Sequence, residues 1–450
     1  MPHLRFRSIV VAIFLAGALV GRAGAAEPVL ISELGSERAT TGPGNNIVTH
    51  AGKTHVVWQD AEKPGKNGYV NRVRTLDRAT GQWSPAVTLG PGIDNHARPT
   101  IAVDSRGRLH VVLSGHNTMM FYRRSVRPND ASEWTKPEPV DRGTYPMLVC
   151  GPDDVLVVAA RPGTHSGVNM YVKTSDDGKW ETRESVIRRN KKYSGYAGYN
   201  VSLAWGGDGA LHMSADVYEG IGYTTYRGTH QSIVYMRSRD LGKTWSKADG
   251  TTLPPQTDST EADVLAEIDV GLHGPAQTPR LRNGGIVVDS KNRPYIYFTE
   301  AEAGDGRPRL ATLDENNQWQ DLPLAEAFAK QRPDATVLGA RGHLTAGPDD
   351  ALYVLIEYSQ KLPPGTVPAR FSRKIGIDLL TSRDGGRTFT TRELYPIDAK
   401  RHLSQAGFER QTGHNDLSAG RLPSLLITDG EQRYPAADEV IQNKVFWLQP

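Results

Sequence analysis

Residues 100–112 read Thr-Ile-Ala-Val-Asp-Ser-Arg-Gly-Arg-Leu-His-Val-Val. Two short apolar runs flank a turn of Asp, Ser, Arg and Gly, and residues of these types favour tight turns. The β-branched residues on either side of the turn favour strands. The stretch therefore predicts an antiparallel β-hairpin.

The same hairpin recurs about every 45–85 residues. The further copies cover residues 47–58, 147–158, 201–213, 285–297, 344–354 and, more weakly, 417–427. Most copies are followed by a third strand and then by an aromatic residue, namely Trp83, Trp134, Trp180, Trp245, Trp319 or Phe389. Four antiparallel strands repeated six or seven times are typical of a β-propeller. We therefore predict an all-β fold, a seven-bladed β-propeller of four-stranded antiparallel blades, with essentially no helix.

Ring closure completes this prediction. We expect the region 440–447 to pair with residues 29–31, which leaves no long exposed sheet edge. A sandwich of two domains is the main alternative, but the regular spacing over nearly the whole chain argues against it.

Residues 1–25 have the composition of a secretory signal peptide. Arg5 and Arg7 precede an apolar run over residues 9–20, and residues 23–25 (Ala-Gly-Ala) are small enough for a cleavage site. The run is too short for a membrane span of about 20 residues, although an uncleaved anchor stays an alternative. We predict one propeller domain over residues 26–450, and a secreted or periplasmic protein that contacts no membrane after signal cleavage.

The charges of the remaining chain balance. The 53 basic residues include Arg5, Arg7 and Arg22 in the signal segment, which holds no acidic residue, so 50 basic residues face 50 acidic ones. A neutral body offers no electrostatic surface for nucleic acid, and we expect no such partner. Cys150 is the only cysteine. It excludes an intramolecular disulfide and a multi-cysteine metal site, and its apolar neighbours predict burial.

Two segments, residues 238–245 and 382–389, share the pattern Ser-x-Asp-x-Gly-x-Thr-Trp/Phe, and residues 174–180 are a shortened relative. They resemble the Asp-boxes of sialidase-like propellers built from bacterial neuraminidase repeats. Asp and Ser side chains satisfy turn amides and Gly takes the strained position, so we expect a structural role. A sialidase itself is not expected, because no Arg-Ile-Pro motif follows the signal segment and the related residues 421–423 (Arg-Leu-Pro) lie at the wrong end.

Hairpin geometry brings four polar residues together. Residues mirrored about a tight turn lie side by side on paired strands. In the hairpin of residues 100–112, His96 mirrors position 115, next to His116. In the following hairpin, Tyr145 mirrors position 160, next to Arg161. We predict that these four side chains surround one spot at the propeller axis.

These residue types suit one chemistry. A base that removes a proton next to a carboxylate needs that carboxylate neutralised, because negative charge builds up during the transfer. Arg161 can neutralise it, a neutral His can accept the proton near pH 7, and the Tyr145 hydroxyl can protonate the leaving sugar oxygen. Together they are the components of a β-eliminating lyase that acts on uronic-acid polysaccharide.

Local motifs strengthen this interpretation. Residues 94–99 (DNHARP), 114–117 (SGHN) and 144–146 (TYP) are similar to segments of a branch of these propellers that contains ulvan lyases and related enzymes cutting rhamnose–glucuronate linkages. The resemblance implies that His96 and Tyr145 are the base and the acid. It further implies that His116 assists and that Arg161 holds the substrate carboxylate.

Two other function classes stay open. The same scaffold hosts exo-rhamnosidases, so a glycoside hydrolase is one alternative, and a non-catalytic carbohydrate-binding propeller is the other. In each case the expected partner is a polysaccharide or oligosaccharide. Some lyases of this type carry a structural ion, but the sequence shows no compact ligand cluster in which to place one. We therefore predict no cofactor, and a structural metal ion stays an alternative.

Further residues at strand starts are candidates for substrate contact. We predict this role for Tyr199, Asn200, Asp216, His343 and His414, with Tyr199 opposite Asp216 across their hairpin. Additional rim candidates are His230, Arg280, Glu300, Glu357 and Tyr358. By contrast, His55, His110 and His212 occupy equivalent positions inside strands, which predicts packing roles.

Overall fold

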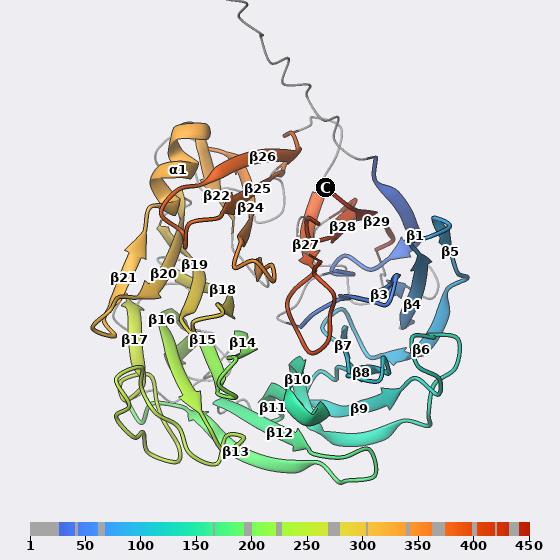
Figure 1. Cartoon of the computed structure of the whole chain (residues 1–450), viewed down its shortest axis with the longest axis horizontal. Coiled ribbons are helices and arrows are strands. Elements are labelled where there is room, and N and C mark those ends of the chain that lie inside the picture. Colours follow the sequence, from blue (N-terminus) through green and yellow to red (C-terminus); the bar gives the residue numbers. More distant parts are fainter. Residues whose placement is uncertain are drawn as a thin grey trace, which may run out of the picture.

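The computed structural model describes residues 27–40, 44–61, 68–164, 167–192, 200–221, 227–268, 280–302, 305–338, 343–361, 374–397, 403–418, 421–431 and 441–450. Within these ranges the strands form five hydrogen-bonded sheets, which stand in a ring around a central axis (Figure 1). The prediction of an all-β propeller is confirmed at this level. The predicted signal segment lies outside the described residues.

Both ends of the described chain share the largest sheet. Its strands follow the order β27-β28-β29-β1-β3-β4-β5, with β2 paired to β3 and β6 paired to β4. Their bounds are β1 (Val29–Gly35), β2 (Ile47–His50), β3 (Lys53–Ala61), β4 (Tyr69–Asp77), β5 (Gln82–Trp83), β6 (Val87–Gly92), β27 (Leu403–Phe408), β28 (Leu425–Asp429) and β29 (Asn443–Leu448). Val29 pairs with Trp447 and Leu30 with Phe446. The predicted ring closure by the two ends of the chain is therefore confirmed.

The second sheet carries the candidate site and has the order β13-β12-β11-β10-β9-β8-β7. Its strands are β7 (Pro99–Val103), β8 (Leu109–Leu113), β9 (Thr118–Arg124), β10 (Glu138–Cys150), β11 (Leu156–Pro162), β12 (Gly167–Lys173) and β13 (Glu181–Arg188), with the short 3-10 helix η1 (Pro152–Asp154) after β10. The first half of β10 pairs with β9 and the second half with β11. One long strand thus connects two of the sequence repeats.

Three smaller sheets complete the ring. One holds β14 (Asn200–Trp205), β15 (Leu211–Ile221), β16 (Arg227–Ser238) and β17 (Asp263–Glu267). The next holds β18 (Arg280–Val288), β19 (Pro294–Glu302), β20 (Asp305–Leu313) and β21 (Trp319–Leu322). The last holds β22 (Ala335–Val337), β23 (Leu344–Ala346), β24 (Leu352–Gln360), β25 (Gly376–Ser382) and β26 (Thr390–Tyr395).

One α-helix among the described residues departs from the prediction of essentially no helix. This helix, α1 (Leu324–Gln331), consists mainly of strong helix formers. It buries Leu324 and Phe328, which lie four residues apart and so share one helix face. Its apolar residues follow the 3.6-residue period of a helix, which the hairpin pattern of the chain does not predict. Among the described residues, no helix has both the length and the apolar character needed to cross a membrane.

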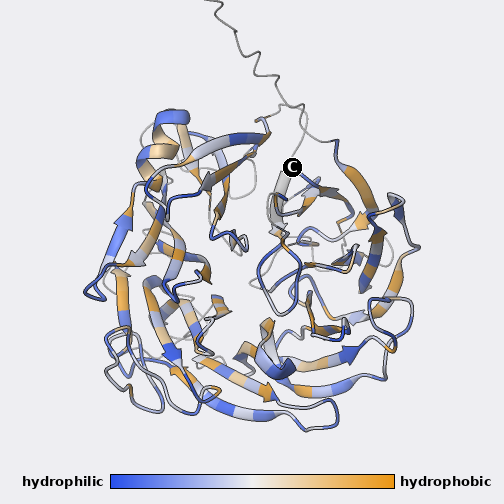
Figure 2. Cartoon of the chain, viewed as in Figure 1, coloured by the Kyte–Doolittle hydropathy of each residue, from blue (hydrophilic) through white to orange (hydrophobic). Residues whose placement is uncertain are grey.

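The apolar core lies between neighbouring sheets. One cluster joins Val157 and Met170 of the second sheet to Met213 and Met236 of the next, with Trp245 also buried against it. Hydrophobic residues run along the strands, whereas many peripheral turns are hydrophilic (Figure 2). Burial between sheets leaves the loops at the strand ends available for polar side chains.

The two full Asp-boxes fold alike. The Ser238 hydroxyl accepts a hydrogen bond from the Gly242 N–H at 2.8 Å, and the Asp240 carboxylate accepts one from the Thr244 N–H at 2.8 Å. Gly242 has a φ of +76°, a conformation that favours glycine. Residues 382–389 repeat the two bonds at 2.8 and 3.0 Å. The predicted structural role is confirmed.

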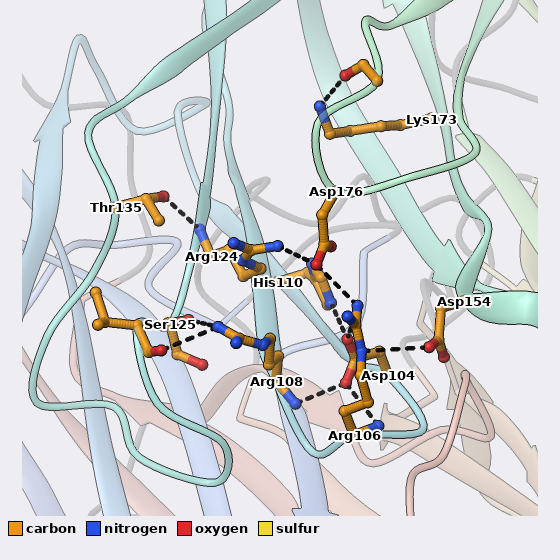
Figure 3. A network of polar contacts seen from close by, with 12 residues as sticks. Asp104, Arg106, Arg108, His110, Arg124, Ser125, Thr135, Asp154, Lys173 and Asp176 are labelled. Atoms are coloured by element: carbon orange, nitrogen blue, oxygen red, sulfur yellow. Dashed lines mark hydrogen bonds and ion pairs between the residues drawn. The ribbon is translucent and has the colours of Figure 1, made fainter.

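The shortened box contributes Asp176 to a polar network between neighbouring turns (Figure 3). Arg106 Nη2 lies 3.0 Å from an Asp176 oxygen and 3.2 Å from an Asp104 oxygen. His110 Nε2 lies 3.3 Å from Asp104, and His110 Nδ1 lies 2.7 Å from the Tyr122 hydroxyl. His110 is only 2% exposed. This histidine is therefore a packing residue, as predicted.

The two equivalent histidines make stability sensitive to acid. Burial lowers the pKa of His55 and of His212 to about 4. Since the unfolded chain titrates near pH 6.5, it binds more protons than the folded chain below that pH. We expect the free energy of unfolding to fall between about pH 6.5 and pH 4, by up to about 3 kcal/mol for each histidine.

Urea unfolding at pH 7 and at pH 4.5 measures this loss. The His212→Gln variant should show a smaller drop between the two pH values than the wild type, because one proton-linked penalty is removed. An equal drop in both proteins would contradict the assignment.

Candidate active site

His96 and His116 meet at one end of the β7–β8 hairpin. β7 and β8 are paired from Val103 with Leu109 to Pro99 with Leu113. His96 precedes this paired segment and His116 follows it, so both leave the sheet at the same end. Their rings stack with centroids 4.1 Å apart and an interplanar angle of 22°. The convergence expected from the hairpin is thus present.

Asp94 holds the two rings, and it is a site residue that the sequence patterns did not single out. Its Oδ1 lies 3.1 Å from His96 Nδ1 and accepts a 2.7 Å bond from the His96 backbone N–H, and its Oδ2 lies 2.5 Å from His116 Nδ1. Partial burial opposes ionisation of this carboxyl. The hydrogen bonds from His116 and His96 outweigh that effect, so the pKa of Asp94 lies well below its usual range.

This arrangement determines which ring nitrogens face outward. An ionised carboxylate only accepts hydrogen bonds, so the Nδ1 atom next to each Asp94 oxygen carries the proton. A neutral imidazole with its proton on Nδ1 has its lone pair on Nε2. Burial lowers the pKa of His96 to about 4, although its bond to Asp94 works in the opposite direction. At neutral pH, His96 therefore presents Nε2 as a proton acceptor.

Tyr145 reaches the histidines through an irregularity in β10. The register between β10 and β11 shifts between Thr144 and Met147, and Tyr145 has a φ of +60°, which is uncommon for a tyrosine. Bulges of this kind redirect a side chain and are frequent next to active sites. The Tyr145 ring centroid lies 5.9 Å from that of His96. The guanidinium of Arg161 lies 5.1 Å from the same ring centroid.

Arg161 approaches from β11, where it pairs with Thr144. Its Nη2 donates to Asn117 Oδ1 and to Thr144 Oγ1, both at 3.1 Å. Because a guanidinium only donates, these contacts fix the Asn117 amide with its oxygen toward Arg161 and its NH₂ on the other side. Arg161 is 4% exposed and Asn117 is half-buried. Arg161 therefore fixes the orientation of the Asn117 amide, and it also brings a positive charge to the site.

The structure brings together all four residues predicted from the hairpins: His96, His116, Tyr145 and Arg161. Their catalytic roles stay predictions. Asp94 stood in the motif over residues 94–99, but only the loop conformation shows that its carboxylate turns back onto both rings. Asn117 likewise stood beside His116 without a signal of its own.

Four of the five predicted substrate-binding residues, Asn200, Asp216, His343 and His414, lie within the described part of the chain. Tyr199 is outside the described residues. Asn200, in place of Tyr199, pairs directly with Asp216. Asp216 is fully buried and accepts hydrogen bonds from the Asn200 side chain at 2.6 Å and from the Asn283 N–H at 2.9 Å. In this structure Asp216 and Asn200 support the sheet and do not line a surface.

The structure places His343 beside a buried glutamate and His414 at the end of β7 that is remote from His96. His343 is buried, and its Nε2 lies 3.6 Å from Glu357. His414 donates its backbone N–H to the Val103 carbonyl at 3.1 Å, at the end of β7 opposite to His96. A cavity of about 250 Å³ lies there, lined in part by Cys150, Trp205 and His414. Placing His414 in the same site as His96 is therefore wrong, because the two lie at opposite ends of the strand.

One group of residues has the composition of a metal site. Asp94, His96 and His116 offer three ligand atoms that all lie within 4.8 Å of one another. The expectation that the chain holds no compact ligand cluster is wrong, because the fold of the loop before β7 could not be deduced from spacing.

Comparison with curated proteins gives relatives named as ulvan lyases. The chain is 22% identical over 292 residues to an ulvan lyase of Alteromonas sp. (strain LOR), covering 56% of this chain and 58% of that protein. It is 23% identical over 333 residues to an ulvan lyase of Pseudoalteromonas sp. (strain PLSV), covering 62% of this chain and 65% of that protein. The chain thus spans about three fifths of the length of these curated relatives.

Solved structures show the same fold. An ulvan lyase structure described as bound to -[GlcA(1-4)Rha3S]- matches with a TM-score of 0.65 at 14% identity, covering 94% of this chain and 96% of that chain. The family model described as "BNR repeat-containing family member" matches residues 48–327. This match covers more than half of the sequence, so the chain belongs to the BNR repeat-containing family.

Proposed function

We propose that this protein is a polysaccharide lyase that cleaves uronate-containing, ulvan-like glycans by β-elimination. One observation carries the proposal: Asp94 orients His96 through Nδ1, and the ring centroids of His96 and Tyr145 lie 5.9 Å apart. A base and a phenol at this separation can flank one sugar–sugar bond. The relatives named as ulvan lyases support the same substrate class.

The reaction uses these groups as follows. His96 Nε2 takes the proton from the uronate C5, and the electron pair of that C–H bond forms the C4–C5 double bond. The bond between C4 and the glycosidic oxygen breaks, and the Tyr145 hydroxyl donates its proton to the departing oxygen. The Asn117 amide, whose oxygen is held by Arg161, donates its N–H groups to the uronate carboxylate. These hydrogen bonds stabilise the carboxylate as its negative charge increases.

The contacts of Asp94, Glu300 and Glu357 do not favour a hydrolase that uses these carboxylates. Hydrolysis of a glycosidic bond normally needs two carboxyl groups on either side of it. Asp94 is engaged by two histidines. Of the two rim glutamates named above, Glu300 lies 3.4 Å from Arg309 and Glu357 is buried beside His343.

The experiment incubates the protein with ulvan, with other uronate polysaccharides and with a neutral polysaccharide as control. We expect ultraviolet absorbance from the new double bond, and products whose mass lacks added water, from uronate substrates alone. Saturated products that have gained water would replace the proposal with a hydrolase. Binding without cleavage would replace it with a carbohydrate-binding propeller.

We also propose the finer architecture and location that the sequence predicts. Within the described residues β1 and β3 share a single pair, Gly35 with Asp60, and β10 changes partner midway along its length. Dividing the two large sheets at these points, beside the three small ones, supports seven blades. Export as a secreted or periplasmic protein, after cleavage of residues 1–25, is proposed from the sequence alone.

A further inference from the structure

We infer that Asp94, His96 and His116 form a binding site for a divalent transition-metal ion, and that an ion bound there switches off the elimination reaction. The metal site rests on geometry alone. Its inhibitory effect rests on the proposed function, because it concerns the His96 ring that acts there as the general base.

The ligand set selects the class of ion. Two imidazole nitrogens and one carboxylate oxygen suit Zn²⁺ and its neighbours Co²⁺ and Ni²⁺, whereas Ca²⁺ and Mg²⁺ prefer oxygen ligands. Three protein ligands with open positions resemble the zinc sites that keep room for water. His96 and His116 are half-buried, and the Asp94 side chain is 37% exposed, so an ion has access from solvent.

The distances require only small movements. Zinc–nitrogen bonds of about 2.0–2.1 Å in a tetrahedral site put neighbouring ligand atoms about 3.3 Å apart. The Nδ1 atoms of His96 and His116 lie 3.1 and 2.5 Å from the two Asp94 oxygens. An ion in the place of the two bridging protons therefore needs the carboxylate to move back by a fraction of an ångström. It also needs the two stacked rings, whose planes are 22° apart, to tilt until both Nδ1 lone pairs point at the ion.

Metal binding rearranges the protons. A neutral imidazole that binds a metal through Nδ1 must carry its proton on Nε2. The proton of His96 then moves from Nδ1 to Nε2, with no net proton released. Nε2 becomes a donor and can no longer accept the uronate C5 proton. His96 therefore cannot bind the ion and act as the general base at the same time.

The first test measures binding without activity. The full-length protein, treated with a chelator and dialysed, is titrated with Zn²⁺ by calorimetry and with Co²⁺ by visible absorption. We expect one ion per chain in wild type. Removal of an outer-shell partner usually weakens metal binding by roughly 10–100-fold. Asp94→Asn and His116→Gln each remove a direct ligand, so each should weaken binding by at least that much. His50→Gln, at a histidine outside the group, should bind as wild type does.

The second test measures the rate on a uronate polysaccharide in the same preparations. Added Zn²⁺ should lower the wild-type rate in proportion to site occupancy, and excess chelator should restore it. Absence of binding, or binding equal in wild type and Asp94→Asn, would overturn the metal site and leave the proposed function intact. A rate that rises with Zn²⁺ would overturn the inhibition. Normal metal binding without turnover in the chelated enzyme would instead overturn the proposed lyase activity.

Discussion

The His96→Ala variant is expected to lose turnover on uronate polysaccharide by roughly 10²–10⁴-fold, which is the usual contribution of a well-placed general base. His96 is the imidazole that Asp94 orients beside the Tyr145 ring. Alanine removes the only atom of this residue that can accept the C5 proton. The measurement is the initial rate of double-bond formation at saturating substrate, at neutral pH and with chelator present.

The fold should survive this change. The His96 side chain is 21% exposed and belongs to none of the buried apolar clusters between sheets. Circular dichroism and thermal unfolding should therefore match wild type, and His50→Gln provides a second histidine replacement that keeps full activity. Near-normal turnover by a folded His96→Ala protein would remove the base from the proposed mechanism.

The sequence could predict the convergence of the histidines because antiparallel pairing has a fixed register. Thr100 pairs with Val112, so the true mirror of His96 is position 116 itself, one residue from the position expected from the turn. For Asp216 the same rule predicts Tyr199 as the partner, and the observed partner is the next residue, Asn200. Inside a hairpin an error in the turn centre of half a residue shifts the pairing by only one position.

Loop residues could not be predicted in this way. Asp94 stands two residues before His96, but it meets both rings only because the loop turns back, with the Ala97 N–H donating to the Asp94 carbonyl at 3.0 Å. His414 follows β27 in a long connection that no strand register constrains, and it lies near the opposite end of β7. The bulge that directs Tyr145 toward the site has no sequence signal that we recognise.

The Arg161→Lys variant is expected to lower kcat by roughly 10²–10³-fold with only a small change in KM. Lysine keeps the charge but loses the planar group that lies 5.1 Å from the Tyr145 ring centroid and donates to Asn117 and Thr144 at 3.1 Å. Charge on the uronate carboxylate grows only as the proton leaves, so these contacts matter more in the transition state than in the bound substrate. A rise in KM with unchanged kcat would contradict this role.

Asn117→Asp tests whether Arg161 acts through its neighbour. Aspartate keeps an oxygen for Arg161 and tolerates the φ of +59° at this position, but it replaces the amide donors with a negative charge facing the uronate. We therefore expect a loss of kcat at least as large as in Arg161→Lys. A hydrolase would show the opposite pattern, tolerating both changes and failing when Glu300 or Glu357 becomes glutamine. Since each mechanism depends on a different set of charges, the four variants measured on one substrate separate elimination from hydrolysis.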